Sequence, residues 1–89
     1  MISLTATLLN RRGLHARASA KFVRLVEDCD LSVEVTKGAT TVNGKSIMGL
    51  LMLGAAQGDS ITLSLSGPEE ESLSQALKAL IEDKFGESE

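Results

Sequence analysis

Residues 10–21 read Asn-Arg-Arg-Gly-Leu-His-Ala-Arg-Ala-Ser-Ala-Lys, and the interpretation of the whole chain starts from this stretch. It contains the only histidine, His15. Small and then apolar residues from Ala16 onward predict a helix with His15 at its N-terminus, where backbone N–H groups have no partner within the helix. Such an end carries partial positive charge and suits a phosphate. The stretch therefore indicates a nucleophilic histidine placed beside a phosphate site.

The neighbours of His15 have defined roles in this hypothesis. Gly13 can adopt a positive φ and turn the chain sharply into the helix. A neutral imidazole at His15 keeps a lone pair that can attack phosphorus. Arg17 offers paired, planar donors that fit phosphoryl oxygens. The alternative is a surface histidine with a structural role at a helix start, and the spacing of the residues leaves both interpretations open.

The pattern of apolar residues predicts an α+β fold with the order βαββαβα. Alternation of apolar and polar residues indicates strands at 2–8, 31–36 and 60–66. A short strand is expected at 39–42, between the turns at Lys37-Gly38 and Asn43-Gly44. Helices are expected over 16–28, over 47–53 and from Pro68 to about Gly86. Alternating strands favour an antiparallel sheet with one solvated face and one face covered by helices. The first helix is expected to bury Phe22, Leu25 and Val26.

Composition limits the class of protein. The 89 residues make a single domain over 1–89, and 43% hydrophobic residues with only 2% aromatic predict an aliphatic core. No apolar run is long enough for a membrane span and no signal-peptide pattern opens the chain. The lone cysteine, Cys29, forms no internal disulfide, which fits a cytoplasmic protein. A net charge of −3 argues against nucleic-acid binding.

The positions of charged residues and of the single histidine exclude further classes of function. The spacing of Arg17, Lys21 and Arg24 puts them on one helix face, which is either a solvated surface or a site that steers an acidic partner. One histidine without a cysteine pair predicts no metal site. No carboxylate lies within residues 10–21 to act as a base, so we expect no independent hydrolytic activity.

Two motifs carry a resemblance to a known family. Residues 13–17, Gly-Leu-His-Ala-Arg, resemble the active-site signature of the HPr family, the histidine-containing phosphocarriers of the bacterial phosphotransferase system. Residues 44–51, Gly-Lys-Ser-Ile-Met-Gly-Leu-Leu, resemble the regulatory-serine region of that family. The resemblance implies an open-faced β-sandwich with sheet order 1-4-2-3 and three helices on one face. Ala18 departs from the family, which usually has proline there, and should loosen the helix start.

The resemblance implies a carrier rather than an independent enzyme. Phospho-enzyme I would donate a phosphoryl group to Nδ1 of His15, and an EIIA-type protein would accept it afterwards. Gly13, Ala16 and Arg17 would bind the phosphate, and no cofactor is expected. In the nitrogen-related branch of the family the same chemistry serves regulation, and the sequence does not choose between that branch and sugar uptake. A third alternative is a binding module that never accepts phosphate.

The second motif implies a regulatory site and a docking surface. Ser46 is either a helix N-cap alone or also the target of a serine kinase or phosphorylase. We expect a monomer whose interface for enzyme I and EIIA-type proteins comprises Arg17, Lys21, Arg24, Ile47, Met48 and Leu51.

Overall fold

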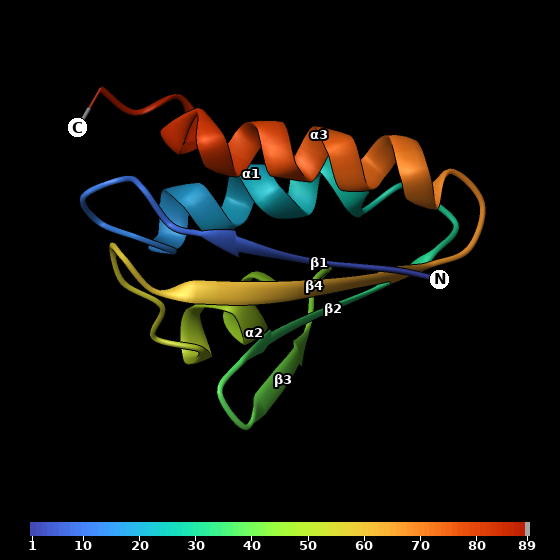
Figure 1. Ribbon diagram of the computed structural model, residues 1–89, viewed down its shortest axis with the longest axis horizontal. Helices are drawn as coiled ribbons and strands as arrows, with labels where there is room; N and C mark the ends of the chain where they lie inside the picture. The colour runs from blue at the N-terminus through green and yellow to red at the C-terminus, as the bar shows by residue number, and fades with distance from the viewer. Residues whose placement is uncertain (89) are drawn as a thin grey trace.

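The computed structural model describes residues 1–88 and confirms the predicted order of elements (Figure 1). The strands are β1 (Ile2–Thr7), β2 (Ser32–Lys37), β3 (Thr40–Asn43) and β4 (Ser60–Ser66). The helices are α1 (Ala16–Val26), α2 (Ile47–Met52) and α3 (Glu70–Glu82), followed by a short 3-10 helix, η1 (Lys84–Gly86). No helix within residues 1–88 is both long and apolar enough to cross a membrane.

The four strands form one antiparallel sheet in the order β1-β4-β2-β3. Leu63 in β4 faces Leu4 of β1 on one side and Val35 of β2 on the other. Because side chains alternate between the two faces of a strand, this register gathers the apolar residues on one face. The expected open-faced sandwich is thus confirmed, with the three helices on the apolar face.

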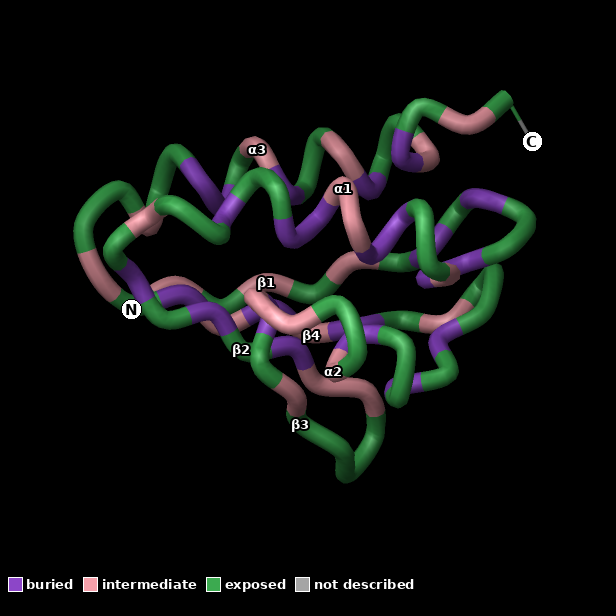
Figure 2. The backbone as a smooth tube through the Cα atoms, turned by 180° about the vertical axis from the view of Figure 1, so that it is seen from behind, coloured by how far each residue is buried: buried purple, intermediate pink, exposed green. Residues whose placement is uncertain are grey.

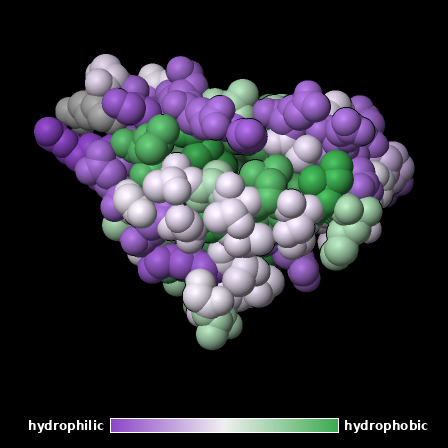
Figure 3. Space-filling model, in the orientation of Figure 1, coloured by the Kyte–Doolittle hydropathy of each residue, from purple (hydrophilic) through white to green (hydrophobic). Residues whose placement is uncertain are grey.

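The uncovered face of the sheet carries mostly hydroxyl side chains. A row of threonines crosses all four strands, in the order Thr5, Thr62, Thr36 and Thr41. The Oγ1 atoms of Thr5 and Thr62 are 3.2 Å apart, and those of Thr36 and Thr41 are 2.8 Å apart. Threonine favours strands and still bonds to water, so this face is stable without a covering layer. Hydrophilic side chains line the outer side of α3 in Figure 3, and side chains of intermediate hydropathy cover much of the strands below.

The core lies between the sheet and the helices. Figures 1 and 2 show α1 and α3 side by side above the sheet, and α2 packs against α1 and β3. The only two aromatic side chains, Phe22 and Phe85, are both fully buried. Aliphatic side chains from the sheet, such as Leu63 and Val35, complete the core as composition predicts.

The first helix is shorter than expected, and one of its predicted core residues is wrong. It ends at Val26, not at 28, and Leu25 is 37% exposed. Val23 is buried instead. The buried stripe of this helix comprises Ala18, Ser19, Phe22, Val23 and Val26. Leu25 lies at the margin of that stripe because each residue advances about 100° around the helix axis.

The third helix begins two residues later than predicted. It starts at Glu70 and not at Pro68, because Glu69 adopts a left-handed conformation with φ of 63°. The Glu70 carboxylate accepts a hydrogen bond from the Gly67 N–H at 3.2 Å and lies 2.9 Å from the terminal ammonium of Met1. These two contacts fix the strand-to-helix turn.

The predicted end of this helix at Gly86 is also wrong. The helix stops at Glu82, and Lys84 and Phe85 both have φ of 56°. The resulting η1 turn inserts the Phe85 ring into the core. Burial of this ring accounts for a sharp turn that residue periodicity does not predict.

The loop before α1 is held by the loop before β4. The N–H of Leu8 donates to the Asp59 carbonyl at 2.9 Å, and the N–H of Leu14 donates to the Ala55 carbonyl at 2.9 Å. Gly13 has φ of +62° and lies directly against residues 55 and 56. A side chain has no room here, so this contact requires glycine as well as a positive φ.

Substitution Gly13→Ala should therefore be unusually destabilising. An added Cβ would lie 2.5 Å from the Ala55 carbonyl oxygen and 2.7 Å from the Ala56 Cα. Backbone strain and the clash together should lower the free energy of unfolding by about 3 kcal/mol, measured by urea denaturation. Gly38 is the matched control, because it has φ of +61° with nothing within 4 Å of an added Cβ. Gly38→Ala should cost only about 1 kcal/mol, and equal losses for the two variants would contradict the clash.

Candidate active site

His15 occupies the N-cap position of α1, as the sequence predicts. Its backbone is extended, with φ of −79° and ψ of −176°, and its carbonyl accepts the first helical hydrogen bond from the Ser19 N–H at 2.8 Å. The imidazole does not cap the helix, and the side chain is 20% exposed. The ring is therefore held at the helix start but remains available for other contacts.

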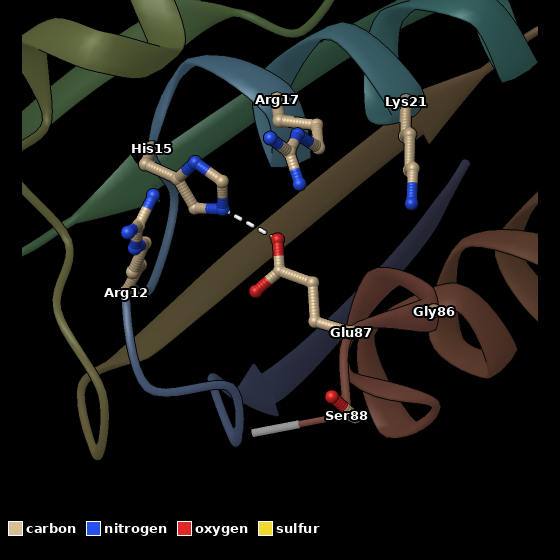
Figure 4. A pocket seen from close by; sticks show the side chains of 7 residues that line it. All are labelled: Arg12, His15, Arg17, Lys21, Gly86, Glu87 and Ser88. Atoms are coloured by element: carbon tan, nitrogen blue, oxygen red, sulfur yellow. Dashed lines mark hydrogen bonds and ion pairs between the residues drawn. The ribbon is translucent and has the colours of Figure 1, made fainter.

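An open pocket of about 350 Å³ surrounds His15. Figure 4 shows that basic side chains from the first loop and α1 face the C-terminal segment across it. The lining residues are Arg12, His15, Arg17, Lys21, Gly86, Glu87 and Ser88. Three cationic side chains give this open pocket a positive potential, which favours an anion.

The C-terminal segment contributes a carboxylate that the sequence analysis did not place in the site. The Oε2 atom of Glu87 lies 2.5 Å from Nε2 of His15 (Figure 4). The Oε1 atom accepts a hydrogen bond from Nδ2 of Asn10 at 3.0 Å. Asn10 is fully buried, and the same Nδ2 donates to the Gly13 carbonyl at 2.7 Å. These contacts connect Asn10, Glu87 and His15 in one polar network.

The network leaves one ring nitrogen unengaged. A carboxylate can only accept hydrogen bonds, so its contact with Nε2 places the proton of a neutral His15 on that atom. Nδ1 makes no hydrogen bond to any residue between 1 and 88. In a neutral ring with this contact, the free lone pair is on Nδ1.

Glu87 is held in its charged form. Burial of the side chain raises the pKa of its carboxyl, but hydrogen bonds from Asn10 and His15 lower it. The charge of Lys21, and that of His15 when its ring is protonated, act in the same direction, and the resulting pKa is below the ordinary value for glutamate. The Glu87 side chain is 14% exposed, so its charge is only partly screened by solvent.

The predicted phosphate-binding residues fall into two groups. The Gly13 N–H already donates to the Asn10 carbonyl at 3.1 Å, and Gly13 is buried, so its observed role is to form the turn. The N–H groups of Ala16 and Arg17 precede the first helical hydrogen bond, and both residues are exposed. These two groups are open to an anion.

The three basic residues predicted to form one surface on α1 lie in different surroundings. Arg17 lines the pocket, whereas Arg24 is exposed further along α1 and is not among the lining residues. Lys21 reaches the C-terminal turn, where its Nζ donates to the Phe85 carbonyl at 2.5 Å. Arg12 lines the pocket although it was not assigned to it from the sequence. The adjacent Arg11 and Arg12 indicate local positive charge in the sequence, but they do not indicate which of the two side chains faces His15.

The second motif forms the cap and one face of α2. Ser46 is the N-cap, and its Oγ accepts a hydrogen bond from the Gly49 N–H at 3.0 Å, which confirms the capping role. Leu50 is fully buried. Ile47, Met48 and Leu51 remain exposed, Met48 by 69%.

Two further apolar side chains are exposed, Met52 by 78% and Leu9 by 43%. No three His, Cys, Asp or Glu side chains between residues 1 and 88 are grouped so that they could hold a metal ion.

The site lies in a chain whose sequence matches one family over most of its length. Residues 2–83 match the family model described as the PTS HPr component phosphorylation site. The chain belongs to the HPr family. It is thus a phosphocarrier of the phosphotransferase system, which agrees with the resemblance noted from residues 13–17 and 44–51.

Individual relatives support the same assignment. The phosphocarrier protein HPr of Cupriavidus necator is 43% identical over 89 residues, with both chains covered in full. The phosphocarrier protein NPr of Shewanella violacea is 35% identical over 82 residues, which cover 92% of this chain and 90% of that protein.

Solved structures show the same fold. The crystal structure of HPr-C-His from Thermoanaerobacter tengcongensis has a TM-score of 0.95 at 43% identity, with both chains covered in full. A crystal structure of an HPr dimer from the same organism has a TM-score of 0.76 at 44% identity, covering 98% of this chain and 100% of that one.

The Glu87 network should make stability depend on pH. Because folding lowers the pKa of Glu87, its contribution is present above the ordinary glutamate pKa of about 4.3 and is lost as pH falls through the folded-state pKa. Glu87→Gln should lower the free energy of unfolding by about 1 kcal/mol at pH 7, and this difference from the parent should shrink at pH 3. Urea unfolding at both pH values measures it.

The matched control for this measurement is Glu82→Gln, which removes the same charge from an exposed position at the end of α3. A deficit for Glu87→Gln that is as large at pH 3 as at pH 7 would show that the Glu87 charge does not stabilise the fold.

Proposed function

We propose that Nδ1 of His15 accepts a phosphoryl group from phospho-enzyme I and passes it to an EIIA-type protein. The observation that carries this proposal is the position of His15 at the start of α1, in a pocket lined by Arg12, Arg17 and Lys21. The ring nitrogen that makes no hydrogen bond within the described chain is the one assigned to the chemistry.

The transfer needs positioning and charge stabilisation more than covalent machinery. The Nδ1 lone pair forms a bond to phosphorus while the bond from phosphorus to the donor's histidine breaks, and the donor nitrogen recovers that electron pair. The N–H groups of Ala16 and Arg17 and the Arg17 guanidinium would bind the phosphoryl oxygens. Arg17 is exposed and makes no ion pair with residues 1–88, so it can release the phosphate for onward transfer.

The surface beside the pocket suits a transient acidic partner. Arg17 and Arg24 are exposed on α1, which packs against α2 with its exposed Ile47, Met48 and Leu51. Flexible methionine side chains adapt to more than one partner. A carrier must bind a donor and an acceptor in turn, and a mixed surface of this kind supports short-lived complexes.

The regulatory branch keeps this chemistry and differs in the acceptor. Its support is the similarity to the NPr of Shewanella violacea, but the match to HPr of Cupriavidus necator is higher in identity and coverage. We therefore place the sugar-uptake branch first. We also propose a monomeric carrier in the cytoplasm, although an HPr dimer is known from Thermoanaerobacter tengcongensis.

His15→Ala should abolish phosphorylation while the fold is retained, because only His15 supplies an imidazole. Labelling with radioactive phosphoenolpyruvate and enzyme I, followed by tests for an acid-labile and alkali-stable phosphate, measures it. Arg17→Ala should have an intermediate effect, because its labelling should be slower than that of the parent but should still occur. Label on another residue of His15→Ala would contradict the assignment of His15. The folding control is thermal unfolding of His15→Ala, which should occur at the same temperature as for the parent.

Ser46→Asp should weaken docking of enzyme I and slow phosphorylation of His15 without unfolding the domain. Aspartate is a good N-cap, so it can replace the Ser46 Oγ bond to Gly49, but its negative charge opposes an acidic partner. The transfer rate at several carrier concentrations, in low and high salt, measures the effect. The defect should shrink at high salt because salt screens exposed charges.

The matched control is Ser66→Asp, which adds the same charge at the exposed end of β4, on the uncovered face of the sheet. Equal rates for Ser46→Asp and the parent at low salt would show that Ser46 serves only as a cap.

A further inference from the structure

Ser19 is a buried polar residue near the start of α1 that the chemistry proposed for His15 does not use. The residue is fully buried, and its Oγ donates a hydrogen bond to the Leu14 carbonyl at 3.2 Å. Its backbone N–H donates to the His15 carbonyl at 2.8 Å. One residue of α1 therefore holds the carbonyl groups of the two peptides on either side of the His15 Cα atom.

We propose that Ser19 is a positioning residue for phosphoryl transfer, whose hydroxyl fixes the peptide that leads into His15. The proposal rests on the proposed function of His15. The hydrogen bond of the hydroxyl goes to the backbone, so Ser19 acts on the reaction through the position of His15 and not through the phosphoryl group.

The two hydrogen bonds of Ser19 orient two peptide planes. A peptide unit is planar, so a carbonyl held in place also fixes the direction of the N–H in the same unit. The bond from Oγ fixes the peptide that joins Leu14 to His15. The bond from the N–H fixes the peptide that joins His15 to Ala16, and with it the Ala16 N–H that would bind a phosphoryl oxygen. The His15 side chain starts from the Cα atom between these planes.

Leu14 depends on the hydroxyl for the last of its anchors. Its side chain is buried, and its N–H donates to the Ala55 carbonyl at 2.9 Å. Its carbonyl accepts no hydrogen bond from residues 1–88 other than the one from Ser19 Oγ. Without the hydroxyl, the peptide before His15 would lose its only restraint on the side of α1.

The neighbouring Ala18 explains why this restraint matters here. Ala18 is the third residue of α1, where proline would fix φ at about −65°, which is the helical value. Alanine leaves φ free, which is why a loose helix start was expected. The Ala18 N–H makes no hydrogen bond to a residue between 1 and 88. The Ser19 hydroxyl therefore restrains this first turn by another means.

Phosphoryl transfer is sensitive to such a restraint because positioning supplies much of its rate. If the peptide before His15 could rotate, the ring would spend only part of the time in the reactive arrangement. The exposed side chains proposed for docking, such as Arg24 and Met48, do not depend on this peptide. The proposal therefore predicts a loss of maximal rate and not of affinity for the partner.

The competing explanation is that the bond only satisfies a buried hydroxyl and contributes to stability. Ser74 provides the comparison, because it is buried near the start of α3 and its Oγ donates to the Glu71 carbonyl at 2.7 Å. Ser74 is not among the residues that line the pocket around His15. A role limited to stability would make the two serines equivalent.

The first test is Ser19→Ala, which removes the hydroxyl and keeps a small side chain. Phosphorylation by enzyme I should fall about fivefold in maximal rate, with an unchanged carrier concentration at half-maximal rate. Ser74→Ala is the matched control and should transfer at the parent rate. Thermal unfolding of both variants measures the loss of stability, which should be similar for the two.

A second substitution tests the restraint itself. Ala18→Pro fixes φ in the first turn of α1 and removes no hydrogen bond, since the Ala18 N–H makes none within residues 1–88. Combined with Ser19→Ala, it should restore most of the maximal rate. Alone it should change the rate little, because the hydroxyl already restrains the turn, so the two substitutions should not be additive.

A third readout needs no enzyme. Nuclear magnetic resonance relaxation of the ¹⁵N-labelled protein measures how rigid each backbone N–H is. The order parameters of His15 and Ala16 should fall in Ser19→Ala and recover in the double variant, while those of β4 stay unchanged. If the parent accepts no phosphate, the proposed function fails, and the order parameters still decide whether the hydroxyl restrains the peptide.

Three results would overturn the positioning role. A parent-like maximal rate for Ser19→Ala would show that the hydroxyl does not contribute to transfer. Equal slowing of Ser19→Ala and Ser74→Ala would assign the effect to stability. A double variant as slow as Ser19→Ala, with Ala18→Pro alone at the parent rate, would show that a loose helix start is not the cause.

Discussion

The structure depends on one constraint, which is that the sheet has a single apolar face. Because polar side chains occupy the other face of every strand, all three helices must pack on the same side. In the resulting layer α1 and α3 run in opposite directions, so the start of α1 and the end of α3 meet at one end of the sheet (Figure 1). The pocket around His15 is formed by this meeting of two distant segments.

The meeting of these two ends also decides the electrostatics of the site. The start of α1 presents N–H groups without helical partners, and Arg12, Arg17 and Lys21 add full positive charges. The segment after α3 contributes one negative charge to the pocket, the carboxylate of Glu87. The pocket around His15 therefore keeps an excess of positive charge, which favours an anion.

A carrier also has to release what it binds. The pocket beside His15 is open, and Arg17, which lines it, is exposed. The stability of the domain comes from elsewhere, from the buried aromatic rings of Phe22 and Phe85 and the aliphatic core. Because the core that stabilises the fold is separate from the surface beside His15, that surface can be exposed and polar without loss of stability.

Much of the fold follows from interactions between residues that are close in the sequence. Alternation of side chains predicted β1, β2 and β4, and turn residues on both sides predicted β3. The small residues after His15 predicted the start of α1, and Ser46 was identified as a cap. Each of these features depends on residues a few positions apart. Gly13 was identified as a turn for the same reason. Predictions failed where packing overrides local pattern, as for the exposed Leu25 and the turn that buries Phe85.

The contact between His15 and Glu87 depends on how distant segments pack together. Twelve acidic residues are present in the chain, and no local pattern distinguishes Glu87 from the others. Its contact with His15 depends on the antiparallel packing of α1 and α3 and on the left-handed turn at residues 84 and 85. The sequence indicated His15 as the candidate nucleophile, because a helix start is a local property. The structure decided which nitrogen is held, because that depends on a carboxylate 72 residues away.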